Sequence, residues 1–162
     1  MPVDTLTPGR PMLFMGEGFR VHATSHTTGG GFLIAEIQSR PGGGPVHMHS
    51  HEAAEQYMCL EGEITVVTDE GVHVLRPHDT VTITPWLPHT YRNLADQPAR
   101  LLCTLSPPHD MEAFLLEVCE PVAHADAPLP QVTREQSDHA MQVAARHGMR
   151  ILDPYDPAVL GG

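Results

Sequence analysis

Four side chains with metal-binding chemistry lie at spacings that can bring them together. His49 and His51 flank Ser50. If this segment is a strand, both imidazoles point to the same side, with their Cα atoms about 7 Å apart. Glu55 opens the next predicted strand, and His89 lies at the start of another strand far along the chain. Three imidazoles and a carboxylate suit a transition-metal ion, and on a six-coordinate ion they leave positions open for a substrate or dioxygen.

The elements that must position these residues are predicted to be short strands. Pro and Gly interrupt the chain at frequent intervals, as in an all-β domain. Apolar or alternating segments predict strands over 32–39, 55–60, 63–68, 72–75, 80–84, 90–93 and 100–105, with a further candidate at 114–119. We expect residues 55–75 to form an antiparallel meander, with turns at 61–62 and 69–71.

One helix is predicted, over residues 133–147. Thr133 and Gln136 fit a capping box, and Gly148 lies where a C-terminal cap is expected. The apolar stripe at helical spacing consists of Ala140, Met141, Ala144 and Ala145. Many short strands and one late helix indicate an all-β, jelly-roll architecture with the site inside.

The length and composition favour one globular domain. The chain has 162 residues, of which 41% are hydrophobic and 18% are charged. We expect a barrel core over about 18–120, a surface loop over 121–132, and a helix and tail over 133–162. Three Cys without a C-x-x-C pair predict neither a disulfide framework nor a thiolate zinc site.

The charge and hydropathy exclude several kinds of partner. All nine basic residues are Arg, and the formal net charge is −11, which repels phosphate backbones and anionic membranes. No segment approaches the roughly 20 apolar residues of a membrane helix. Residues 1–20 lack the basic and apolar regions of a signal peptide. We therefore expect a cytoplasmic protein that binds neither nucleic acid nor membrane.

A known motif contains three of the four candidate ligands. The pattern Gly43-x5-His49-x-His51-x3-Glu55-x6-Gly62 agrees with the first cupin motif at every spacing. Five fixed residues at four fixed spacings seldom arise by accident. The chain therefore resembles the cupin superfamily.

The second cupin motif is less complete. His78, Thr84 and Trp86 occupy the positions where this motif has Gly, Pro and Gly, whereas His89 and Asn93 keep the right separation. These substitutions affect the turn before His89 and the shape of the pocket there, where the indole of Trp86 replaces a glycine. The glycine-rich segment 41–45 and the residues 145–148 also resemble the small, single-domain, quercetinase-like (cupin 2) proteins.

The resemblance implies a fold, a metal site and a chemistry. The fold is the cupin double-stranded β-helix, here with a C-terminal helix, and the family usually forms dimers, so we expect a homodimer. One divalent ion per chain (Fe, Mn, Ni, Co, Cu or Zn) is implied, with His49, His51, Glu55 and His89 as ligands. The flavonol-cleaving members use dioxygen. Glu55 is implied as a base for an acidic substrate hydroxyl as well as a ligand.

Four further residues are candidates for the substrate pocket. In an unbroken strand His47 shares the face of His49, as an alternative ligand, a substrate contact or a solvated rim residue. Tyr57 and Tyr91 face the barrel interior by strand parity, either as core aromatics or as pocket residues. Trp86 is either a stacking surface for an aromatic substrate or a lid over the core.

Three classes of function fit this site. The first is a metal-dependent dioxygenase acting on a small oxygenated molecule, with aromatic, flavonol-like and diketone compounds as candidates. The second is a redox-silent isomerase, cyclase, decarboxylase or lyase in which the metal acts as a Lewis acid. The third is a non-catalytic protein that binds a small ligand, although a purely binding role does not require Glu55.

Overall fold

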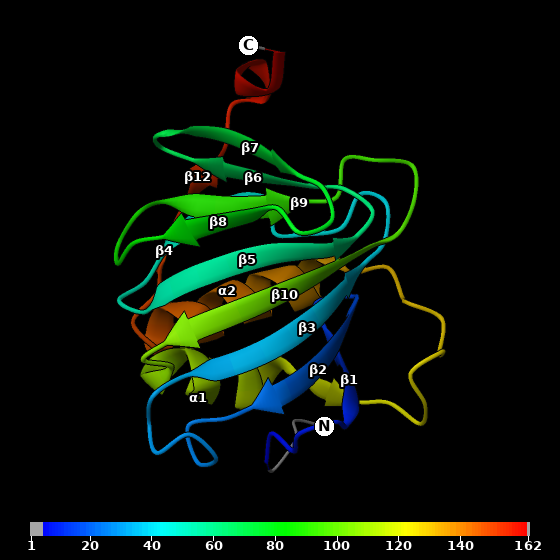
Figure 1. The fold of residues 1–162 in the computed structure, drawn as a ribbon, viewed down its shortest axis with the longest axis vertical. Helices are drawn as coiled ribbons and strands as arrows, with labels where there is room; N and C mark the ends of the chain where they lie inside the picture. The colour runs from blue at the N-terminus through cyan, green and yellow to red at the C-terminus, as the bar shows by residue number, and fades with distance from the viewer. Residues whose placement is uncertain (1–4, 162) are drawn as a thin grey trace.

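The protein consists mainly of two antiparallel sheets that share one apolar core, as seen in a computed structural model that describes residues 5–161 (Figure 1). Two helices lie behind the larger sheet in this view. The arrangement is the double-stranded β-helix with a C-terminal helix, so the predicted fold class is confirmed.

The larger sheet has seven strands in the order β11-β1-β2-β3-β10-β5-β8. Their bounds are β1 (Pro11–Phe14), β2 (Glu17–Ala23), β3 (Leu33–Ser39), β5 (Ala54–Glu61), β8 (Thr80–Ile83), β10 (Ala99–Ser106) and β11 (Glu120–Pro121). Side chains alternate between the two faces of a strand, and β3 buries Leu33, Ala35 and Ile37 in this way. The buried face of this sheet forms one wall of the molecule's interior.

The smaller sheet has five strands in the order β12-β4-β9-β6-β7. Their bounds are β4 (His47–Ser50), β6 (Ile64–Thr68), β7 (Gly71–Leu75), β9 (His89–Arg92) and β12 (Arg150–Pro154). Ile151 of β12 lies opposite His49 of β4, so the C-terminal region returns to the histidine-bearing strand. The sequence analysis assigned no strand there.

The predicted meander over residues 55–75 is correct only in its second half. β6 and β7 form the expected hairpin, with Thr68 opposite Gly71. β5 and β6, however, belong to different sheets. The chain changes sheet at Gly62, whose φ of +75° is one that L residues rarely adopt. A Cβ at Gly62 would lie 2.7 Å from the Pro98 carbonyl oxygen, so this crossing requires glycine.

Residues 114–119 are not a strand, because most of them belong to helix α1 (His109–Val118). Met111, Phe114 and Leu115 are buried and follow the i, i+3, i+4 spacing of one helix face. Two acidic residues in the first turn complement the helix dipole. The strand prediction was wrong because it rested on the apolar residues at the C-terminal end of α1 and left out the first turn of this helix.

The predicted C-terminal helix is confirmed as α2 (Arg134–Arg146), with the capping box between Thr133 and Gln136. Its buried face differs slightly from the predicted stripe, because Val143 is buried whereas Ala145 is exposed. A short 3-10 helix, η1 (Pro157–Gly161), follows β12. Within residues 5–161, no helix is both long enough and apolar enough to cross a membrane.

Candidate metal centre

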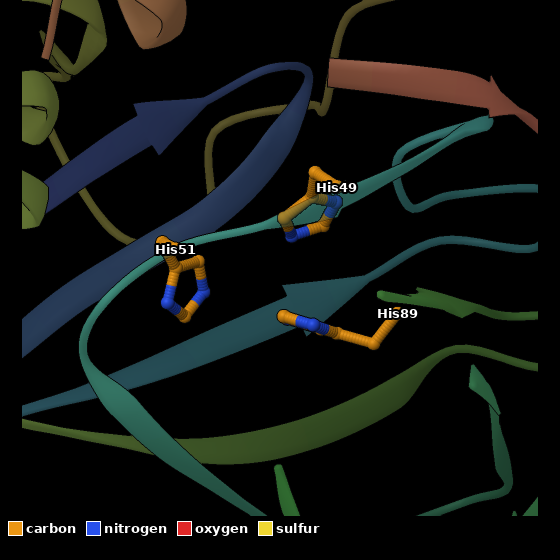
Figure 2. Close-up of side chains that lie close together, drawn as sticks. All are labelled: His49, His51 and His89. Carbon is orange, nitrogen blue, oxygen red and sulfur yellow. The ribbon is translucent and has the colours of Figure 1, made fainter. Parts of the chain in front are cut away.

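Strands β4 and β9 bring three histidines together. His49 and His89 lie directly opposite each other in the β4–β9 pair, and His51 follows the end of β4. Figure 2 shows the side chains of His49, His51 and His89 close together. Their ligand nitrogens all lie within 4.8 Å of one another. His89 is fully buried, His51 is 3% exposed and His49 is 8% exposed. The predicted same-side orientation of His49 and His51 is thus present.

Hydrogen bonds fix which nitrogen of each ring faces the cluster. The Nδ1 atoms of His51 and His89 lie 2.9 Å and 2.8 Å from backbone carbonyl oxygens two residues away, and that of His49 lies 3.4 Å from such an oxygen. A carbonyl can only accept, so each Nδ1 carries a hydrogen and each neutral ring presents the lone pair of Nε2. Metal-binding histidines are usually oriented in this manner.

Glu55 joins the cluster from β5. Its Oε2 lies 2.9 Å from Nε2 of His51 and 3.0 Å from Nε2 of His89. The Cys103 thiol donates to the other carboxylate oxygen over 2.9 Å and so fixes which oxygen faces the histidines. The side chains of Glu55, Cys103 and both histidines are buried.

This donor set fits a divalent cation. A carboxylate oxygen and two imidazole lone pairs repel one another unless a cation or an added proton lies between them. Adjacent ligands on an octahedral ion with bonds of about 2.1 Å are about 3 Å apart, close to the separations of Glu55 from His51 and His89. Imidazole and carboxylate are also the ligands that Fe, Mn, Ni and Zn accept.

The local electrostatics shift the pKa values of three of the candidate ligands. Burial, assisted by the charge of His89, lowers the pKa of His49 to about 3, so this ring is neutral near pH 7. Burial also lowers the pKa of His51, but the hydrogen bond and charge of Glu55 outweigh it and raise this pKa overall. Burial raises the pKa of Glu55, but its bonds to His51 and His89 hold that pKa well below the usual value. Glu55 is therefore a carboxylate.

A cavity of about 630 Å³ opens beside the cluster, with His49 and Glu55 in its wall. Its remaining walls are mostly apolar and come from both sheets, the glycine-rich loop before β4 and both helices. This volume suits a small organic molecule. Three of the four predicted pocket residues line the cavity: His47, Tyr57 and Tyr91.

These three residues have different surroundings. The rings of Tyr57 and Tyr91 are buried with centroids 5.7 Å apart, and burial raises the pKa of both hydroxyls well above the usual value. They are therefore protonated donors. His47 is half-buried, and its Nδ1 lies 2.8 Å from the carbonyl oxygen of Leu152.

Trp86, the fourth predicted pocket residue, does not line this cavity. It is 39% exposed, and the Arg150 guanidinium lies 4.2 Å from the centre of its ring. The backbone of Trp86 has a φ of +65°, and its N–H donates a hydrogen bond to the His51 carbonyl. Trp86 instead borders a second pocket of about 100 Å³, which it shares with His51.

Several residues of the site were not predicted from the sequence. Glu17 on β2 is buried at the cavity wall, where it accepts hydrogen bonds from the hydroxyls of Ser39 and Tyr91. Burial raises the pKa of Glu17, although these bonds and two nearby arginines oppose the change. Its position in the alternating pattern of β2 was an available signal. Cys103 gave no such signal, because its contact with Glu55 depends on the register of β10 against β5.

Close packing explains why the first cupin motif begins with a glycine, Gly43. A Cβ at Gly43 would lie 2.5 Å from a Glu17 carboxylate oxygen and 2.7 Å from the Ser39 hydroxyl. Both distances are too short for any side chain. Gly43 therefore allows the loop before β4 to pack against this buried polar pair.

Comparison with known proteins identifies the matching segment. The cupin domain family matches residues 35–105. An uncharacterized protein of Methanocaldococcus jannaschii is 32% identical over 73 residues, which are 44% of this chain and 58% of that protein. The match thus spans 58% of the length of this curated relative.

Solved structures share the fold at low sequence identity. An RmlC-like cupin from Shewanella frigidimarina is 19% identical with a TM-score of 0.52, over 65% of this chain and 93% of that one. A cupin 2 conserved barrel domain protein from Salinispora arenicola is 18% identical with a TM-score of 0.51, over 65% and 88%. A cupin-superfamily sugar phosphate isomerase from Silicibacter pomeroyi is 24% identical with a TM-score of 0.50, over 65% and 69%.

Proposed function

We propose that this chain, whose residues 35–105 match the cupin domain family, is a metal-dependent dioxygenase acting on a small oxygenated organic molecule. The observation that carries the proposal is the apolar cavity beside the histidine cluster, with His49 and Glu55 in its wall. Apolar walls suit an aromatic, flavonol-like or diketone substrate better than a highly hydrated one.

His49, His51 and His89 would hold the ion, since their ligand nitrogens converge. Glu55 would join them, since its Oε2 lies 2.9 Å and 3.0 Å from Nε2 of His51 and His89. A bound divalent metal supplies a Lewis acid and, if it is redox-active, a centre for oxygen chemistry. Glu55 can in addition accept a proton from an acidic substrate hydroxyl, because it is a buried carboxylate at the cavity wall.

The surroundings of the site support this chemistry in three ways. The Tyr57 hydroxyl stays protonated and can donate to an oxygen of the substrate. The Cys103 thiol holds Glu55 in one orientation through a 2.9 Å contact. The apolar walls exclude water and so protect a reactive substrate anion.

Metal analysis and oxygen consumption test the proposal together. Protein purified without a His tag is analysed by mass spectrometry, then loaded separately with Fe, Mn, Ni, Co, Cu or Zn. Each form is assayed in an oxygen electrode against phenols, flavonols and β-diketones. The proposal expects substrate-dependent oxygen uptake with at least one redox-active metal and none with Zn.

Two other results would replace the proposal with a specific alternative. Conversion of a substrate under anaerobic conditions, also with Zn, would identify a redox-silent isomerase, cyclase, decarboxylase or lyase. Tight substrate binding without conversion by any metal form would identify a non-catalytic binding protein. The similarity to a sugar phosphate isomerase concerns the fold, and sugar phosphates belong in the anaerobic panel.

A further inference from the structure

Arg40 is a cation in the wall of the largely apolar cavity. It follows directly after β3 and lines the cavity together with His49 and Glu55. Its Nε is buried and has no hydrogen-bond partner. Within residues 5–161, no ion pair and no side-chain hydrogen bond of Arg40 is found. A partly buried guanidinium that no protein group pairs with is costly, so this position favours binding of an anionic group.

Two further acidic residues of the cavity wall do not fill this role. Asp138 lies 3.8 Å from Arg134 in an exposed ion pair. Glu17 is close enough for the charge of Arg40 to influence it, but the two form no ion pair. Both Glu17 oxygens already accept hydrogen bonds, one from Ser39 and one from Tyr91. Burial also raises the pKa of Glu17, which weakens it as a counter-ion for Arg40.

The other two arginines of this wall differ from Arg40. Arg134 has a side chain that is 94% exposed. Arg92 donates through Nη1 to the carbonyl of Gly44 and through Nη2 to that of Gly42, the latter over 3.0 Å. It therefore holds the glycine-rich loop in place. Arg40 makes no such bonds within the described chain, so its planar fork of donors is available to a ligand.

The rest of the cavity selects the body of that ligand. Apolar side chains cover the walls from the sheet and the helices, among them Phe14, Phe19, Leu33, Met111, Phe114 and Leu115. Phe14 also packs edge-on against Phe114 with ring centres 6.0 Å apart, which closes this region with aromatic surface. A molecule that is polar along its whole length would lose hydration against these apolar walls.

We propose that the cavity binds a substrate with an apolar body and one anionic group, with Arg40 holding the anionic group while the body extends toward His49 and Glu55. A guanidinium matches a carboxylate or a phosphate with two parallel hydrogen bonds. The assignment of the reacting end, at His49 and Glu55, rests on the proposed function. The assignment of the anionic end to Arg40 does not.

Calorimetry with three probes of equal chain length tests this inference: octanoate, octyl phosphate and 1-octanol. Hydrogen bonds to a charged group predict that at least one anion binds about 10- to 100-fold more tightly than 1-octanol. The anion with the greater advantage identifies the preferred group, carboxylate or phosphate. Equal affinity for 1-octanol and both anions would overturn the inference without any variant.

Two variants locate the effect. Arg40→Met should remove the advantage of the anions and leave the affinity for 1-octanol unchanged. Arg76→Met is the matched control, because Arg76 is 69% exposed, pairs with Glu63 and does not line the cavity. Arg76→Met should keep the full advantage. If Arg40→Met binds the anions as wild type does, the inference is wrong.

The same titrations on chelator-treated protein separate this inference from the metal proposal. An anion held by Arg40 keeps its advantage after metal removal, whereas an anion held only by the ion loses it. Loss in chelator-treated wild type combined with retention in Arg40→Met would assign the anion to the metal and contradict the role of Arg40. Failure to detect any metal or turnover would leave the Arg40-dependent selectivity intact.

Discussion

Replacing Glu55 with Gln separates its two proposed roles. Gln keeps the shape and one acceptor oxygen but removes the charge and the basicity. In the structure one Glu55 oxygen lies 2.9 Å and 3.0 Å from two imidazole nitrogens, and the other accepts from Cys103. An amide can occupy the same space, so we expect the fold to be retained.

The size of the effect follows from these contacts. Loss of a carboxylate beside the ion should weaken metal affinity by at least the 10- to 100-fold typical of groups that orient ligands. At saturating metal, loss of the proton acceptor should lower turnover by about 10²- to 10⁴-fold. The assay is turnover against metal concentration, with metal content measured in the same samples.

The titration with metal distinguishes the outcomes. If Glu55 acts as ligand and base, excess metal restores occupancy but not turnover. Full recovery of turnover at high metal would show a ligand without a role in proton transfer. Unchanged metal content together with unchanged turnover would refute both roles and favour a site of three histidines alone.

Three further predictions concern the same site. The variants His49→Ala, His51→Ala and His89→Ala should each lose most of the bound metal in mass spectrometry while keeping a β-type circular dichroism spectrum; full metal content in all three would refute the ligand assignment. Metal affinity in chelator competition should fall from pH 7 to pH 5, because imidazoles bind metal only when neutral. Because the pKa of His51 is raised, protons compete with the metal for His51 up to a higher pH than for an ordinary histidine, whereas His49, with a pKa of about 3, stays neutral. A metal affinity that did not change between pH 7 and pH 5 would contradict this prediction. Gly43→Ala should lower the free energy of unfolding in urea by about 1–3 kcal/mol, as overpacking does, because its Cβ would lie 2.5 Å from Glu17; wild-type stability would show that the loop can move.

The clustering of His49, His51 and Glu55 could be predicted because their spacing is local. His49 and His51 alternate on one strand, and Glu55 begins the next one, so strand periodicity already places them on one side. His89 joins them through its pairing with His49, which only the motif suggested beforehand. The C-terminal helix was likewise predictable, because its capping box is a local signal.

Features that depend on long-range pairing were not predictable. The sequence around Gly62 indicates a turn but not that β5 and β6 enter different sheets. The contact between Cys103 and Glu55 requires the register of two strands that are distant in sequence. Trp86 was expected at the pocket, but its backbone conformation and its contact with Arg150 place it elsewhere.

Anomalous diffraction from crystals of the metal-loaded protein tests the central claim most directly. Data collected at the absorption edge of the loaded metal locate the ion without reference to activity. We expect one peak per chain, about 2.0–2.2 Å from Nε2 of His49, His51 and His89 and from a carboxylate oxygen of Glu55. The absence of a peak at this cluster, or a peak at other side chains, would contradict it.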